Sequence, residues 1–179
     1  MMGIIKIQDL APLTVNEALD AVKSSPRTLL KDLRLFDLLL CNDGESALRH
    51  GVYVFYNEQG ECLYVGMCSS SHFAHRIGGH FGMSPKYGMN TFLRRAVKDL
   101  GLDSKQYQSY VDALPAVGNY SLLIIDANKT GKKVIRQLER VLHTTIKPRL
   151  NFPKGVPRTY TPIDTKSNFG DAVFPDGRP

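Results

Sequence analysis

Six side chains along the chain are of the types that phosphate-ester chemistry requires. An arginine can bridge two phosphate oxygens with its planar guanidinium, and it stays charged at any relevant pH. A single carboxylate can hold a magnesium ion, which keeps several waters and often needs only one or two protein carboxylates. Histidine and tyrosine can position or deprotonate a water, although a phenol with an ordinary pKa of about 10 needs a nearby cation for that role. The six candidates are Tyr53, Tyr64, Arg76, His80, Glu139 and Asn151.

The two tyrosines lie in segments that predict the two strands of a hairpin. Residues 52–56 and 62–67 are rich in β-branched and aromatic side chains, and the polar stretch 57–60 between them is typical of a turn. Tyr53 and Tyr64 are placed symmetrically about this turn. We therefore expect them to lie nearly opposite each other and on one face of the hairpin.

The elements around the hairpin follow from hydrophobic spacing. Apolar residues at helical intervals predict helices, and the continuous apolar run at 122–125 predicts a strand that is buried on both faces. The predicted fold class is α+β, with a small three-stranded antiparallel sheet flanked by helices and an N-terminal helical extension. The predicted helices cover 14–22, 26–40, a short stretch within 69–83 that carries Arg76 and His80, 90–100 (capped by Asn90) and 131–146, and the third strand covers 120–126.

Composition restricts the class of protein. The 179 residues suit one domain, and 42% hydrophobic residues suffice for a packed core. The excess of 23 Lys and Arg over 17 Asp and Glu fits a polyanionic partner without requiring one. Three cysteines without metal-ligand spacing favour a reducing compartment, and neither a membrane span nor a secretory signal is evident. We therefore expect a soluble, cytoplasmic protein.

Five short motifs, taken in order, resemble the GIY-YIG nuclease superfamily. Gly51-Val52-Tyr53 and Tyr64-Val65-Gly66 are similar to the paired strand motifs that name it. Arg76 followed four residues later by His80 resembles the helix motif. Glu139 on the helix after the third strand, and Asn151 after Lys147-Pro148, resemble the last two. The similarity spans 51–152, the GIY-YIG-like domain, with 1–50 as a helical extension, 83–119 as an insertion and 153–179 as an irregular tail.

This resemblance implies a metal-dependent endonuclease that hydrolyses DNA phosphodiester bonds. Glu139 would be the ligand of Mg²⁺ or Mn²⁺, and Tyr53 would be the base toward the attacking water. Tyr64 would bind the same water or phosphate network, and His80 would help to remove the proton of Tyr53 or position the water. Asn151 would stabilise the local geometry or touch a phosphate.

Substrate recognition would then fall to the additional segments. Basic side chains on the insertion, which are Lys86, Arg94, Arg95 and Lys98, are candidates for nucleic-acid binding. The family often has a lysine directly after the second motif, where this chain has Met67, and Lys86 is a candidate replacement for that cation. A restriction-like enzyme acting on duplex DNA would be expected to form a homodimer.

Other interpretations remain open at this point. The tyrosines could be an ordinary cross-strand pair, Arg76 and His80 could be solvent-facing neighbours, and Glu139 could form an exposed helix ion pair. Asn151 could simply end its segment. At the level of function, the alternatives are a structure-selective nuclease on branched DNA and a catalytically silent nucleic-acid-binding module of the same fold.

Overall fold

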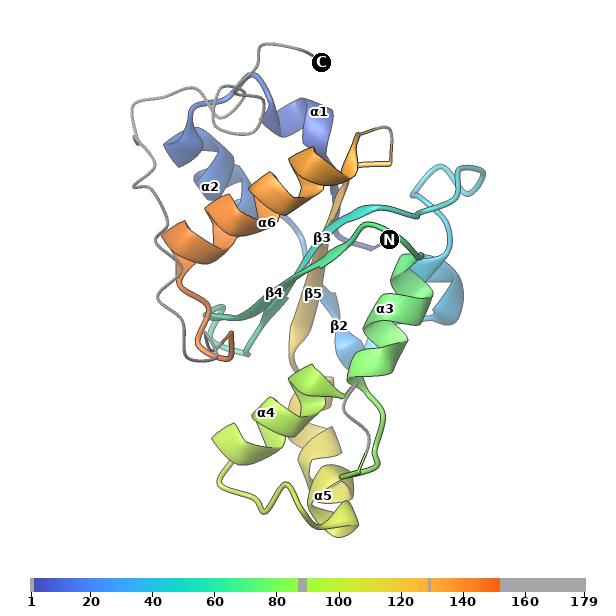
Figure 1. Ribbon diagram of the computed structural model, residues 1–179, viewed down its shortest axis with the longest axis vertical. Helices are drawn as coiled ribbons and strands as arrows, with labels where there is room; N and C mark the ends of the chain where they lie inside the picture. The colour runs from blue at the N-terminus through green and yellow to red at the C-terminus, as the bar shows by residue number, and fades with distance from the viewer. Residues whose placement is uncertain (1, 87–89, 129, 152–179) are drawn as a thin grey trace.

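The computed structural model describes residues 2–86, 90–128 and 130–151, so the predicted tail over 153–179 lies outside the described residues. The α+β class is confirmed (Figure 1). Six α-helices occur within the described residues, and a single mixed sheet of five strands lies between them. All three cysteines are free, as their spacing predicts.

The predicted three strands lie side by side and include one edge of this sheet. Strand β3 (Gly51–Tyr56) lies between β4 (Cys62–Cys68) and β5 (Ser121–Asp126), and both pairings are antiparallel. The prediction of only three strands is wrong, because two short strands share the other edge of β5. They are β1 (Ile4–Lys6), which is parallel to β5, and β2 (Thr28–Leu29), which is antiparallel to it.

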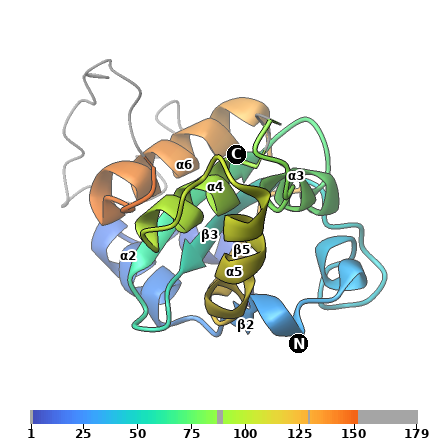
Figure 2. The same ribbon diagram turned by 90° about the horizontal axis from the view of Figure 1, so that it is seen from below.

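Each face of the sheet is covered by three helices, which gives two separate hydrophobic cores (Figures 1 and 2). Strand residues alternate between the faces, so Val52, Val54 and Val65 enter one core while Tyr53 and Tyr64 enter the other. The valine face is covered by α1 (Ile7–Leu10), α2 (Val15–Ser24) and α6 (Lys132–Ile146), and the tyrosine face by α3 (Phe73–His80), α4 (Thr91–Asp99) and α5 (Tyr107–Gly118).

The hairpin register differs from the symmetrical one. Tyr53 lies opposite Gly66, and Tyr64 lies opposite Phe55, so the prediction that the two tyrosines are nearly opposite is wrong by two positions. An irregularity between Phe55 and Tyr56 accounts for one position, and the turn accounts for the other because the Asn57 amide donates to the carbonyl oxygen of Glu61. A shift of two positions leaves every side chain on its expected face, so both tyrosines still share one core.

The N-terminal region is only partly helical. The predicted helix over 14–22 forms as α2, and Thr14 caps it through a capping box with Glu17. The predicted helix over 26–40 is wrong, because this stretch forms β2 and two 3₁₀ turns, Leu30–Asp32 and Leu35–Leu38. Thr28 and Leu29 form backbone hydrogen bonds with the open edge of β5, and a helix over this stretch would not allow that pairing.

Two glycines allow β3 to approach its neighbours closely. Gly51 has a φ of 154°, and a Cβ there would lie 1.9 Å from the carbonyl oxygen of Ile125 on β5. A Cβ at Gly66 would lie 2.3 Å from Cζ of Tyr53, because the tyrosine ring extends across this position of β4. The two outer glycines of the sequence motifs therefore have a direct steric explanation.

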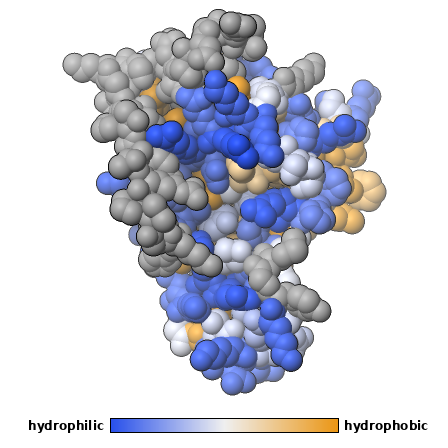
Figure 3. Space-filling model, in the orientation of Figure 1, coloured by the Kyte–Doolittle hydropathy of each residue, from blue (hydrophilic) through white to orange (hydrophobic). Residues whose placement is uncertain are grey.

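The outer surface seen in Figure 3 is largely hydrophilic over α6 and α4. Within the described residues, none of the helices has the length and apolar character needed to cross a membrane.

Candidate active site

Strands β3 and β4 bring the two phenols together. The rings of Tyr53 and Tyr64 are nearly parallel, with centroids 6.3 Å apart and an angle of 20° between their planes. Tyr53 is fully buried, whereas Tyr64 retains 7% of its surface. Burial raises the pKa of both phenols. In the protein alone, both are therefore neutral at physiological pH.

Helix α3 supplies the two side chains that face the hydroxyl of Tyr53. Because His80 follows Arg76 by four residues, both project from the same side of this helix. Nε2 of His80 lies 2.5 Å from the Tyr53 hydroxyl oxygen. Burial, followed by the charges of Arg76 and Arg95, lowers the pKa of His80 to about 3, so the ring is neutral.

Arg76 acts on both phenols. It is exposed as a residue, yet its guanidinium lies close enough to the hydroxyl of Tyr53 to lower the pKa of that phenol. Its charge lowers the pKa of Tyr53 and of Tyr64, in opposition to burial, which raises both. Arg76 thus combines access to solvent with a position beside the phenol oxygens, which is what a phosphate-binding cation requires.

Glu139 approaches the phenols from a different helix. Helix α6 lies on the opposite face of the sheet, but it packs chiefly against β4, which is the edge strand. The half-buried Glu139 carboxylate lies close enough that its charge raises the pKa of both Tyr53 and Tyr64, after the larger effect of burial. Residues from β3, β4, α3 and α6 therefore act on one small region.

Asn151 is bound differently from the other five candidates. Its side-chain oxygen accepts a hydrogen bond from the Val65 amide at 2.7 Å, and its side-chain nitrogen donates to the Val65 carbonyl oxygen at 2.8 Å. The preceding Leu150 amide donates to the Leu63 carbonyl oxygen. Asn151 thus satisfies both backbone groups of one residue on the edge strand, directly next to Tyr64. This geometry supports a positioning role and not a phosphate contact.

The donor set fits a hard divalent cation. Within the described residues, no group of three or more histidine, cysteine, aspartate and glutamate side chains could form a protein cage for a metal. A magnesium ion does not require one, because a single carboxylate together with water and phosphate oxygens can complete its coordination. Glu139 would hold such an ion. A positive charge at this position would lower the pKa of both phenols, as the charge of Arg76 does, and so favour the phenolate.

The four candidate nucleic-acid contacts separate into two pairs. Lys86 and Lys98 are exposed. Arg94 donates to the Pro85 carbonyl oxygen at 3.0 Å, and Arg95 donates to the Leu150 carbonyl oxygen at 2.5 Å. The exposed lysines therefore remain candidates for contacts with a polyanion, while the two arginines also hold the backbone of adjoining segments.

Arg95 belongs to the site, which the sequence did not indicate. Its guanidinium lies 5.9 Å from the centre of the Tyr64 ring, and its charge lowers the pKa of Tyr64 and of His80. In the sequence, Arg95 is one of three basic residues on the outer side of a helix, and nothing distinguishes it from Lys98. Arg95 is therefore a second cation near the phenols, besides Arg76.

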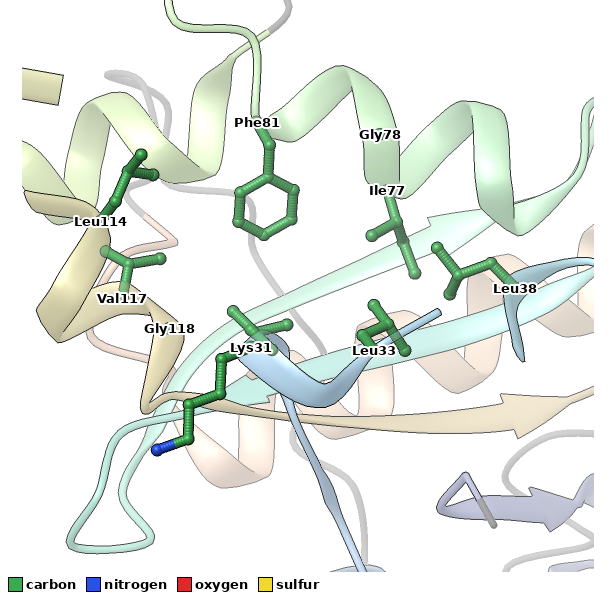
Figure 4. Close-up of a pocket in the computed structure, with 10 residues that line it drawn as sticks. Lys31, Leu33, Leu38, Ile77, Gly78, Phe81, Leu114, Val117 and Gly118 are labelled. Atoms are coloured by element: carbon green, nitrogen blue, oxygen red, sulfur yellow. The ribbon is translucent and has the colours of Figure 1, made fainter. Parts of the chain in front are cut away.

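A separate pocket of about 330 Å³ lies on another side of α3 (Figure 4). Leu33, Ile77 and Phe81 are among its walls, and of the described residues that line it only Lys31 is ionisable. Such a lining offers little for acid–base or metal chemistry. The polar cluster around Tyr53 is therefore the candidate active site.

Comparisons of this chain with protein-family models, with curated proteins and with solved structures gave no match. The function must therefore be inferred from the geometry.

Proposed function

We propose that this protein is a metal-dependent endonuclease that hydrolyses phosphodiester bonds of DNA. The observation that carries the proposal is that the charges of Arg76 and Glu139 both reach the same two phenols and change their pKa in opposite directions. The two residues belong to different helices on different faces of the sheet. A cation and a carboxylate on either side of a pair of phenols suit a phosphate ester together with a divalent ion.

Each side chain then has a distinct task. Arg76 binds the non-bridging oxygens of the phosphate, and Glu139 holds the metal. When bound, the metal supplies Lewis-acid stabilisation of the charge that develops on the phosphate. Tyr53 is the base toward the attacking water, and Tyr64, which lies nearer to the surface, binds the same water or phosphate network. Asn151 keeps the edge strand that carries Tyr64 in place.

The burial of Tyr53 makes its role dependent on the cation. A buried phenol with a raised pKa is a neutral hydrogen-bond donor, so it cannot take a proton from water at neutral pH. Arg76 opposes this effect, and a metal on Glu139 would oppose it further. The proposal therefore requires that activity depends strictly on a divalent ion.

The experiment is incubation of the purified protein with supercoiled plasmid and Mg²⁺, with EDTA as the control. Discrete linear fragments would indicate sequence-specific cleavage, and a smear would indicate a nonspecific nuclease. If the plasmid stays intact, a four-way junction and a flap substrate test for a nuclease of branched DNA. Binding of all these substrates without cleavage of any of them would contradict the proposal and favour a silent binding module.

A further inference from the structure

The start of helix α4 has an unusual cap. A helix leaves its first backbone N–H groups without partners in the helix, and a side chain at the N-cap position usually accepts one of them. Asn90 occupies this position but makes no such bond, because its side-chain nitrogen donates to the Ser84 carbonyl oxygen at 2.9 Å. Asn90 is thus the N-cap residue, as predicted, but its side chain makes no capping hydrogen bond.

His80 supplies the missing acceptor. The backbone N–H of Phe92, in the first turn of α4, points to Nδ1 of His80 at a distance of 3.4 Å. Both residues are buried, with 0% and 1% of their surfaces exposed. A buried amide that lacked this bond would cost free energy, so the contact stabilises the junction between α3 and α4.

This contact determines where the single proton of the neutral imidazole lies. A backbone N–H can only donate, so Nδ1 must be the unprotonated nitrogen that accepts. A neutral imidazole has one ring proton, which is then on Nε2. Because Nε2 lies 2.5 Å from the Tyr53 hydroxyl oxygen, that oxygen is the acceptor of the Nε2–H bond.

We propose that the Phe92 amide fixes His80 as a hydrogen-bond donor to Tyr53, so that His80 stabilises negative charge on the phenol oxygen and does not remove its proton. Burial, and then the charges of Arg76 and Arg95, lower the pKa of His80, which agrees with a ring that carries a single proton. The guanidinium of Arg76, which can only donate, lies near the same oxygen and opposes the effect of burial on the pKa of Tyr53. Neither of these two partners can accept the Tyr53 proton, so that proton passes to solvent water when the phenolate forms.

The proposal changes the role expected for His80 and assigns a role to the inserted segment. The catalytic consequence rests on the proposed nuclease function, whereas the tautomer does not. His80 is here a positioning residue, and Phe92 acts through it by its backbone alone. Residues 83–119 would thus contribute to the chemistry as well as to substrate recognition.

The tautomer can be measured without any activity. Protein labelled with ¹⁵N-histidine is examined at neutral pH by long-range ¹H–¹⁵N correlation, and the His80 ring is assigned by its absence from the spectrum of His80→Gln. The expected spectrum has an unprotonated Nδ1 and a protonated Nε2. A proton on Nδ1, or on both nitrogens, would overturn the proposal and leave the nuclease assignment intact.

Cleavage kinetics distinguish a donor from a base. The amide of His80→Gln can still donate near the position of Nε2, whereas His80→Leu cannot, and neither side chain is a base. We expect His80→Gln to retain cleavage within about tenfold of the original protein, the equivalent of one weakened hydrogen bond, and His80→Leu to lose considerably more. Equal losses of about 10²–10⁴ in both variants would identify His80 as a proton acceptor and contradict the proposal.

Discussion

The position of the Tyr53 ring requires that the residue opposite it on β4, Gly66, has no side chain. The ring extends over Gly66, where a Cβ would lie 2.3 Å from the phenol oxygen as well as from Cζ. The ring is enclosed by Phe73 and hydrogen-bonded to His80, so it cannot move away without loss of these contacts. The glycine of the second strand motif is therefore part of the site, although it has no functional group.

Gly66→Ala should destabilise the fold by about 1–3 kcal/mol, as overpacking of a closed core does. Gly78→Ala on α3 is the matched control, because a Cβ there meets nothing within 4 Å and alanine favours a helix by about 0.5–1 kcal/mol. Urea unfolding measures both variants. Equal stability of Gly66→Ala and the original protein would contradict the steric role of Gly66.

His80 should make stability depend on pH. The unfolded chain has a histidine pKa near 6.5, while in the folded protein burial lowers the pKa of His80 to about 3. Between these values the unfolded state binds the proton more readily, so stability falls as pH decreases from about 6.5 toward 3. This contribution has a slope of at most about 1.4 kcal/mol per pH unit.

Urea unfolding at several pH values tests this prediction by comparison with His80→Gln, in which the contribution is absent. The difference in unfolding free energy between the two proteins should diminish as the pH falls below 6.5. A difference that stays constant would show that His80 has an ordinary pKa in the folded protein.

Among the elements, the hairpin was predictable and its register was not. The β-branched and aromatic residues identify β3 and β4, and their alternation puts both tyrosines on one face, as the structure has them. The irregularity at Phe55/Tyr56 leaves no signal in the side-chain pattern. For this reason the face was correct while the direct partner of Tyr53 was wrong.

The helix that hydrophobic spacing predicts over 26–40 does not form. The leucines near residues 29–40 fit a helical stripe, but Leu35 and Phe36 remain 64% and 68% exposed. The free edge of β5 offers backbone hydrogen bonds that the sequence of this stretch does not reveal. Helix α5, which contains Pro115, was not predicted from the sequence.

Asn151 holds the outer edge of strand β4 through the backbone of Val65. Asn151→Ala removes the partners of both backbone groups of Val65, so it should lower stability by about 1–3 kcal/mol. Hydrogen exchange should show the Val65 amide losing its protection while the central Val54 amide keeps it. Asn119→Ala, which removes only a bond to Lys31 at the surface, is the control.

Unaltered protection of Val65 in Asn151→Ala would show that Asn151 does not hold this strand. Asn151 would then be available for a phosphate contact, which the resemblance to the nuclease family also allowed.

At the scale of the molecule, residues 1–50 are more than an addition to the domain. Strands β1 and β2 complete the sheet, and Ile7, Leu10 and Val15 are buried in the core that supports α6. We therefore expect that a chain starting at Gly51 does not fold cooperatively. Thermal unfolding followed by circular dichroism tests this, and a sharp transition close to that of the full chain would contradict it.

The candidate site also belongs to the whole molecule, because its parts come from β3, β4, α3 and α6. Motif order in the sequence supplied the candidate residues, but it did not reveal that Glu139 approaches from the helix on the opposite face of the sheet, past its edge strand. Nor did it reveal Arg95 or the Phe92 amide, because both depend on how α4 packs against α3. Side-chain types predict chemistry, whereas helix packing determines which of them meet.

The most direct test of the account is plasmid cleavage in Mg²⁺ by Glu139→Ala, with the exposed Glu58→Ala as the matched control. Fluorescence anisotropy with the same DNA and thermal unfolding accompany the assay. The account predicts that Glu139→Ala folds and binds DNA but has lost cleavage, while Glu58→Ala retains it. Robust Mg²⁺-dependent cleavage by Glu139→Ala would contradict the account.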